Sequence, residues 1–132
     1  MYRITRRLLA QIEQQRGTPA PDAPPQALWL LDRSALMLQA HCDDIAEHLQ
    51  RLGGGCINGD GDYAPAGAAN AGTKKMMDDL YARLSFAHAA CLMLETNARA
   101  LNFSSTAALA SRHRDELAAM LARIKEQSAP AA

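Results

Sequence analysis

The sequence predicts an all-α protein: a bundle of four helices built on a long antiparallel hairpin of the second and third helices. Its 132 residues include 27 alanines and 17 leucines but only five isoleucines and no valine, a composition that favours helices over the pleated surface of a sheet. Turn-forming residues gather in three clusters and leave four segments with helical periodicity. Two of these segments carry apolar residues at steps of three and four, the spacing that keeps one stripe of a helix against a partner.

A chain of this length, with 48% hydrophobic residues, has the usual size of one domain with its own core. The 14 Lys and Arg residues balance the 14 Asp and Glu residues, which argues against nucleic-acid binding driven by net charge. No segment approaches the ~18 apolar residues of a membrane span, and the N-terminus has no apolar core of signal-peptide length. We therefore expect a cytoplasmic protein whose three cysteines are reduced thiols.

The first predicted helix covers residues 2–16 and is basic. A Pro-rich linker, 17–25, ends it. Its arginines outnumber its one acidic residue, and the three candidates for contact with an acidic partner, nucleic acid or an anionic surface are Arg3, Arg6 and Arg7. The alternative is that Ile4, Leu8 and Ile12 dock the helix on its own bundle and leave the arginines in solvent.

The second helix is predicted over residues 26–52. Pro24 and Pro25 suit the first turn of a helix, and three glycines follow Leu52. The next segment, 53–72, contains seven glycines. So many flexible backbone positions predict a long mobile connector rather than a regular element.

The third and fourth helices follow this connector with only a short turn between them. Thr73 is a suitable N-cap for a helix over 73–101. The Ser-Ser-Thr run at 104–106 offers a second set of N-caps, which predicts a fourth helix over 104–127. The sequence thus predicts a compact helical protein with one long connection.

The second and third helices carry matched apolar seams. In the second helix the seam consists of Leu28, Leu31, Ala35, Leu38, Cys42, Ile45, Leu49 and Leu52. In the third helix it consists of Met77, Leu80, Leu84, Ala87, Cys91, Leu94, Ala98 and Leu101. Antiparallel pairing sets Ala35 against Leu94 and Leu38 against Cys91, so that small residues face large ones. We therefore expect these two helices to pack side by side and antiparallel.

A second apolar stripe runs along the same two helices, with Leu30 and Met37 on one and Phe86 and Met93 on the other. A contiguous apolar face is rarely left in water. Three covers are open: the first helix, the fourth helix, or the same surface of a second subunit. The last makes a homo-oligomer, commonly a dimer, the expected state.

Histidine and cysteine concentrate at one level of the expected hairpin. His41 and Cys42 lie on the second helix, and His88 and Cys91 lie on the third. Neutral imidazole and thiolate are zinc ligands, so these four residues are a candidate metal site. The favoured alternative is that both cysteines are buried structural residues, because no Cys-x-x-Cys pair occurs. We expect no cofactor.

Arg83 and His88 enclose four residues, and segment 83–88 resembles the Arg-x4-His motif of helical ribonucleases found in some toxin–antitoxin pairs. The resemblance implies cleavage of RNA, with Arg83 stabilising phosphate charge and His88 transferring a proton. That family usually has a polar residue after the arginine, where this chain has Leu84. The alternative is a surface arginine and a half-buried histidine.

Segment 44–54 is similar to the end of a helix in the ferritin-like proteins that protect bacterial DNA in starvation. The resemblance implies a four-helix bundle whose iron ligands include Glu-x-x-His pairs that project inward. No Glu-x-x-His pair occurs in this chain, so iron oxidation is not expected. The acidic residues of the segment are interpreted as a solvated helix face.

The function that these features favour is protein interaction. We expect a small helical-bundle adaptor, chaperone-like or regulatory protein of the bacterial cytoplasm that presents helix faces to a protein partner and is not an enzyme. One alternative is an RNA-cleaving helical toxin that uses Arg83 and His88. The other is a metal-binding bundle that uses the histidine and cysteine set.

Overall fold

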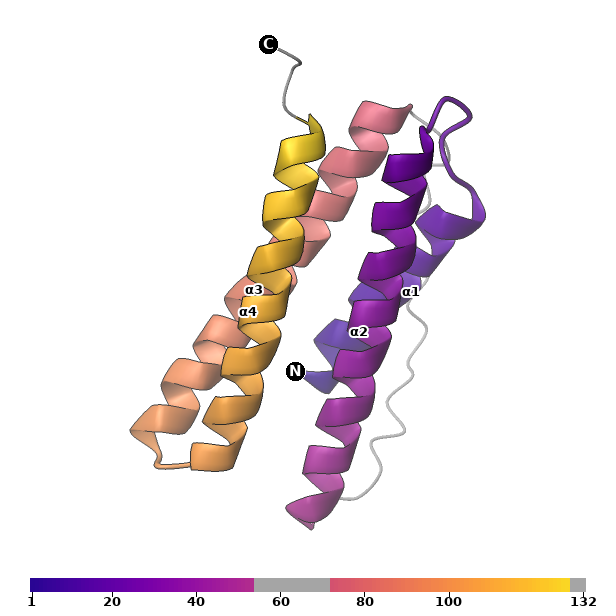
Figure 1. Cartoon of the computed structure of the whole chain (residues 1–132). Coiled ribbons are helices and arrows are strands. Elements are labelled where there is room, and N and C mark those ends of the chain that lie inside the picture. The colour runs from indigo at the N-terminus through magenta and orange to yellow at the C-terminus, as the bar shows by residue number, and fades with distance from the viewer. Residues whose placement is uncertain (54–71, 129–132) are drawn as a thin grey trace.

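The protein is a four-helix bundle. The computed structural model describes residues 1–53 and 72–128, and this part of the chain contains no strand. Its elements are α1 (Tyr2–Gly17), α2 (Pro25–Arg51), α3 (Thr73–Ala100) and α4 (Ser104–Ser128) (Figure 1). The predicted all-α, four-helix fold is confirmed, and each helix end lies within one residue of the expected position. The predicted mobile connector falls almost wholly outside the described residues.

The helices form two antiparallel hairpins, α1 with α2 and α3 with α4 (Figure 1). Around the bundle axis the order is α1, α2, α4, α3, and each neighbouring pair in this circuit is in contact. α2 and α3 approach each other little, and α1 and α4 have no close backbone approach. The second and third helices therefore lie across a diagonal of the bundle.

The expected antiparallel hairpin of helices 26–52 and 73–101 is not found, because α2 and α3 run in the same direction (Figure 1). Gln15 at the end of α1 donates from Nε2 to the backbone oxygen of Met76 at the start of α3, at 3.0 Å. His48 near the end of α2 meets Thr106 near the start of α4. Both α2 and α3 are thus antiparallel to α1 and α4.

The pairing prediction was wrong for a physical reason. A spacing of three and four specifies which face of a helix is buried, but it does not specify which helix covers that face. The connection after α2 is long enough in residues to let α3 begin at either end of the bundle.

Most residues of both seams are nevertheless buried, in one core to which every helix contributes. Fully buried side chains come from α1, α2, α3 and α4, and they include Leu9, Ile12, Leu31, Leu38, Leu80, Leu84, Leu117 and Ile124. Leu28 and Leu52, at the two ends of the seam on α2, and Leu101, at the end of the seam on α3, are exposed. The seams therefore meet along the bundle axis, while α1 and α4 close the two sides.

A Schellman motif joins α3 to α4. Asn102 has a φ of 61°, in the left-handed region that asparagine tolerates better than most residues. The Phe103 N–H donates to the Ala98 oxygen at 2.8 Å, and the Asn102 N–H donates to the Arg99 oxygen at 3.2 Å. These bonds satisfy carbonyls at the end of α3, so the chain reverses at once and α4 begins at Ser104.

Leu38→Ala is expected to lower the free energy of unfolding by about 2 to 5 kcal/mol, because Leu38 is fully buried and its truncation leaves a cavity. Leu36, on the same helix, is 58% exposed, so Leu36→Ala is expected to cost about 0.5 kcal/mol or less. Urea denaturation followed by far-UV circular dichroism measures both. Equal losses in the two variants would contradict this placement of the core.

Candidate functional site

A buried polar layer lies between α2 and α4. The rings of His41 and His113 stack with centroids 3.8 Å apart and planes inclined by 10°. His41 Nε2 lies 3.1 Å from Glu116 Oε1, and His113 Nε2 lies 3.0 Å from Asp44 Oδ2. Each imidazole thus meets a carboxylate of the opposite helix, so two hydrogen bonds cross the interface within one layer.

The same interface carries two further polar contacts. His48 Nε2 lies 2.7 Å from Thr106 Oγ1. Arg112 donates from Nη2 to Asp44 Oδ2 at 3.1 Å. Because a hydrogen bond tolerates little displacement, these contacts fit only one register of α2 against α4.

The two stacked imidazoles are neutral at pH 7. Burial lowers the pKa of His41 to about 4. Burial, with the adjacent His41 ring, also lowers the pKa of His113. A carboxylate only accepts hydrogen bonds, so each neutral ring donates its Nε2–H. The hydrogen bond from His113 in turn holds the pKa of Asp44 below its usual range.

This layer is built for structure rather than for proton transfer to a substrate. Both Nε2 atoms are engaged, and both rings are 2% exposed. A general base has to reach the proton that it abstracts. The arrangement therefore holds α2 against α4, and we expect this contact to weaken at a pH low enough to protonate the buried rings.

His113 and Glu116 were not among the residues singled out from the sequence. A signal is nevertheless present, because Ala110, His113 and Leu117 share the spacing of three and four that marks the buried face of α4. A histidine at such a position indicates a polar group in the core. The sequence alone does not show that its partner is His41.

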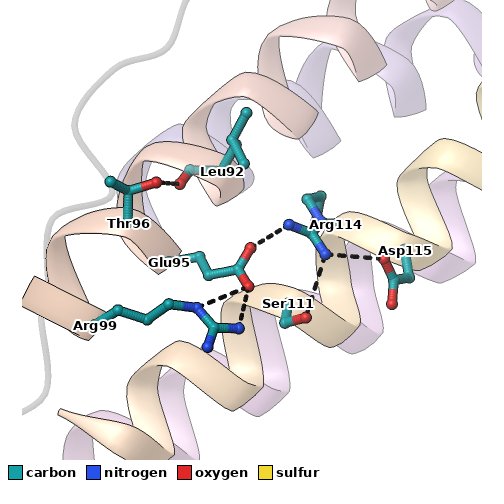
Figure 2. A network of polar contacts seen from close by, with 7 residues as sticks. All are labelled: Leu92, Glu95, Thr96, Arg99, Ser111, Arg114 and Asp115. Atoms are coloured by element: carbon teal, nitrogen blue, oxygen red, sulfur yellow. Dashed lines mark hydrogen bonds and ion pairs between the residues drawn. The ribbon is translucent and has the colours of Figure 1, made fainter. Parts of the chain in front are cut away.

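A second buried network joins α3 to α4 (Figure 2). Glu95 is 4% exposed and accepts hydrogen bonds from Arg99 on its own helix and from Arg114 on α4. Arg114 also reaches Ser111 and Asp115 (Figure 2). The hydrogen bond from Arg99 is the main cause that lowers the pKa of Glu95. An ionised carboxylate is therefore balanced by two guanidinium groups at this interface.

The candidate metal ligands His41, Cys42, His88 and Cys91 are not brought together as a ligand set. His41 stacks on His113, while both cysteines are buried free thiols in the apolar core. Burial raises the pKa of the Cys42 and Cys91 thiols to about 11 each. In the part of the chain that the structure describes, no group of three or more His, Cys, Asp or Glu residues is placed to hold a metal ion.

Arg83 and His88 are both half-buried on α3. A separation of five residues sets two side chains about 140° apart around an α-helix. One guanidinium nitrogen of Arg83, Nη1, is buried without a hydrogen-bond partner, and burial lowers the pKa of this group. The spacing does not place the two side chains on one face of α3, and their role in RNA cleavage stays a prediction.

α1 docks on the bundle through its apolar face, where Leu8 and Ile12 are buried. Arg3 and Arg7 are exposed, and Arg6 is half-buried. The helix therefore docks on its own bundle, as the second of the two alternatives has it, although Arg6 is not left in solvent. Contact of these arginines with an acidic partner stays a prediction.

The outer face of α3 is an apolar surface. Between Leu80 and Leu94 every exposed residue is apolar, and we call this set the α3 stripe: Tyr81, Ala82, Phe86, Ala89, Leu92 and Met93. Phe86 is 58% and Met93 is 66% exposed. By contrast, the exposed positions of α2 and α4 mix apolar with charged residues.

The bundle covers only one half of the second apolar stripe that the sequence predicts. Leu30 is buried in the core and Met37 is half-buried. Phe86 and Met93 are left bare by α1 and α4. Within residues 1–53 and 72–128, neither the first nor the fourth helix covers this surface, and the third cover considered, a second subunit, stays a prediction.

None of the helices among the described residues combines the length and apolarity needed to cross a membrane. Comparison of the chain with known protein families, with curated proteins and with solved structures finds no match in any of the three.

The free energy of unfolding is expected to fall as the pH drops from about 6.5 to about 4. The lowered pKa values of His41 and His113 mean that the unfolded chain binds protons in this window which the folded protein does not bind. Stability from the two neutral rings is therefore fully present above pH 6.5 and is lost below it. The loss from His41 reaches the order of 3 kcal/mol, measurable by urea denaturation at a series of pH values.

Matched variants distinguish the contribution of the two histidines to the pH dependence of stability from that of the other ionisable groups. His41→Gln combined with His113→Gln is expected to flatten the curve between pH 4 and 6.5, while the control His88→Gln keeps the wild-type slope. A wild-type curve that is already flat in this window would show that the histidine layer does not couple stability to pH.

Glu95→Gln is expected to lower the urea midpoint, because it leaves the guanidinium groups of Arg99 and Arg114 without their shared carboxylate. Glu126→Gln is the matched control, since Glu126 is an exposed residue near the end of α4. A midpoint shift of the same size in both variants would argue against a structural role for the Glu95 network.

Proposed function

We propose that this chain is a non-enzymatic protein-interaction module that pairs with a second copy of itself through the α3 stripe. The observation that carries the proposal is a helix face, from Tyr81 to Met93, on which no charged residue is exposed. Contiguous exposed apolar surface marks interaction sites on soluble proteins. A helix that is apolar nearly all round normally has all its sides covered.

The order of small and large residues in the stripe supports a second copy as the partner. Ala82, Phe86, Ala89 and Met93 follow one another at steps of four, three and four. If α3 packs antiparallel on a twofold-related copy, Phe86 faces Ala89 of the partner subunit and Ala82 faces Met93 of the partner subunit. Every layer then sets a large side chain against a small one, as close packing and an isologous contact require.

The charges on α3 also support self-association. Lys74 pairs with Asp78 at 3.0 Å, and Lys75 pairs with Asp79 at 2.9 Å. Both pairs lie before the stripe, and Glu95 with its arginines lies after it. Contact between two stripes therefore buries no exposed ion, which removes the largest cost that would oppose it.

The buried ionisable groups support binding over catalysis. His41 and His113 are engaged with carboxylates, and Glu95 is engaged with guanidinium groups, all at helix interfaces. Groups held in this way specify helix register. A dimer of such bundles presents two sets of helix faces on a rigid scaffold.

Met93→Glu is expected to convert the dimer to monomer, with the dissociation constant raised roughly tenfold or more, because it places a charge in the apolar contact. Light scattering and sedimentation over a range of protein concentrations measure the change. Leu36→Glu is the matched control: Leu36 is 58% exposed but lies on α2, so the dimer is expected to persist.

The register gives a rescue test. Adding Ala82→Lys to Met93→Glu is expected to restore the dimer, because these positions face each other across the twofold axis. Ala100→Lys, at an exposed position of α3 beyond the stripe, is expected not to restore it. A wild-type chain that stays monomeric at every concentration, with circular dichroism showing it folded, would overturn the proposal.

A further inference from the structure

A groove between α2 and α4 combines an apolar floor with two cationic side chains at one end. Its volume is about 440 Å³, and it is lined by Trp29, Arg33, Leu36, Glu116, Met120 and Arg123, among others. Leu36 and Met120 form part of its apolar surface, while Glu116 lies over the histidine layer through its contact with His41. The α3 stripe does not take part in this groove.

Two arginines lie over the ring of Trp29. The guanidinium carbon of Arg33 lies 5.2 Å from the indole centroid, and that of Arg123 lies 5.3 Å from it. Both distances are within the range of a cation–π contact. Within residues 1–53 and 72–128, neither guanidinium makes an ion pair with a carboxylate. Two positive charges therefore converge on one exposed aromatic ring, and the described residues supply no carboxylate that pairs with either of them.

The shape of the groove favours a helical segment over a small molecule. A small ligand needs a site that buries most of its surface, whereas this groove is open to solvent along the seam of two helices. From Trp29 to Ala40, the lining residues of α2 span ~16 Å, or about three helical turns. An amphipathic helix lays its apolar face into such a groove through residues spaced three and four apart.

We propose that this groove binds an acidic amphipathic helix of a partner protein. Apolar residues of that helix pack on Leu36 and Met120, and carboxylates in its terminal turn pair with Arg33 and Arg123 beside Trp29. Arginine suits this role because its planar guanidinium both stacks on an aromatic ring and forms paired hydrogen bonds to a carboxylate. The inference extends the proposed role as an interaction module, and it does not depend on the dimer.

Trp29 is the only tryptophan in the chain, so its fluorescence reports on the groove directly. The probe is a designed helical peptide of about 14 residues without tryptophan, with two glutamates in one terminal turn and leucines at steps of three and four. A second peptide is identical except that lysines replace the two glutamates. The acidic peptide is expected to shift the Trp29 emission and to bind roughly 5- to 30-fold more tightly than the lysine peptide.

Arg33→Gln combined with Arg123→Gln is expected to abolish the preference for the acidic peptide, as measured by calorimetry, with the helical content unchanged because both residues are exposed. Lys125→Gln is the matched control, since it removes one exposed positive charge from the same helix outside the groove. Leu36→Asp is expected to weaken binding of both peptides. Met93→Glu, which acts on the dimer, is expected to leave peptide binding unchanged, so the two proposals fail separately.

Three results would overturn the inference. The first is equal affinity of the wild-type protein for the two peptides. The second is a preference for the acidic peptide that survives loss of both arginines. The third is an emission that does not respond to either peptide but is quenched by a short uridine oligonucleotide, which would assign the arginine-flanked ring to nucleic acid instead.

Discussion

The diagonal placement of α2 and α3 is the constraint on which the rest of the structure depends. Each of these helices turns a seam of small and large apolar residues toward the bundle axis, and most residues of both seams are buried there. α1 and α4 then close the two open sides, each against both of the diagonal helices. Because α3 packs against α1 and α4 and approaches α2 only across the diagonal, no helix of the described chain is left to cover its outer face.

Register in this bundle is specified by polar contacts more than by its aliphatic core. Leucine and alanine layers repeat at similar spacing along every helix, so displacement by one layer changes little in an apolar core. The stacked His41 and His113 with their carboxylates fit one register of α2 against α4. The Glu95 network does the same for α3 against α4. A buried polar group that loses its partner costs far more than a displaced leucine.

The two proposed surfaces occupy different sides of the molecule for the same architectural reason. The α3 stripe lies on the outside of one helix, where none of the described helices covers its apolar residues. The groove lies where α2 and α4 meet, and its arginines are held over Trp29 by both helices. Self-association through α3 leaves this groove free on each subunit, so a dimer would display two of them.

The sequence by itself determined the four helices and the faces that they bury. Proline, glycine and serine bound the segments, and apolar spacing alone marks the seams that hold Leu38 and Leu84, because both effects act within one helix. It also marked Phe86 and Met93 as an apolar stripe in need of a cover. Which helices became neighbours, and in which direction, only the tertiary structure decided.

Local spacing contains no information about the partner of a face, and this is why the antiparallel hairpin of α2 and α3 was wrong. For the same reason His113 could be placed on a buried face but not against His41, since that contact joins residues 72 positions apart in the chain. The groove around Trp29 likewise needs α2 and α4 side by side. Features that depend on one helix, such as its buried face, were therefore predictable from the sequence. Contacts between side chains of different helices were not, because they depend on how the helices pack.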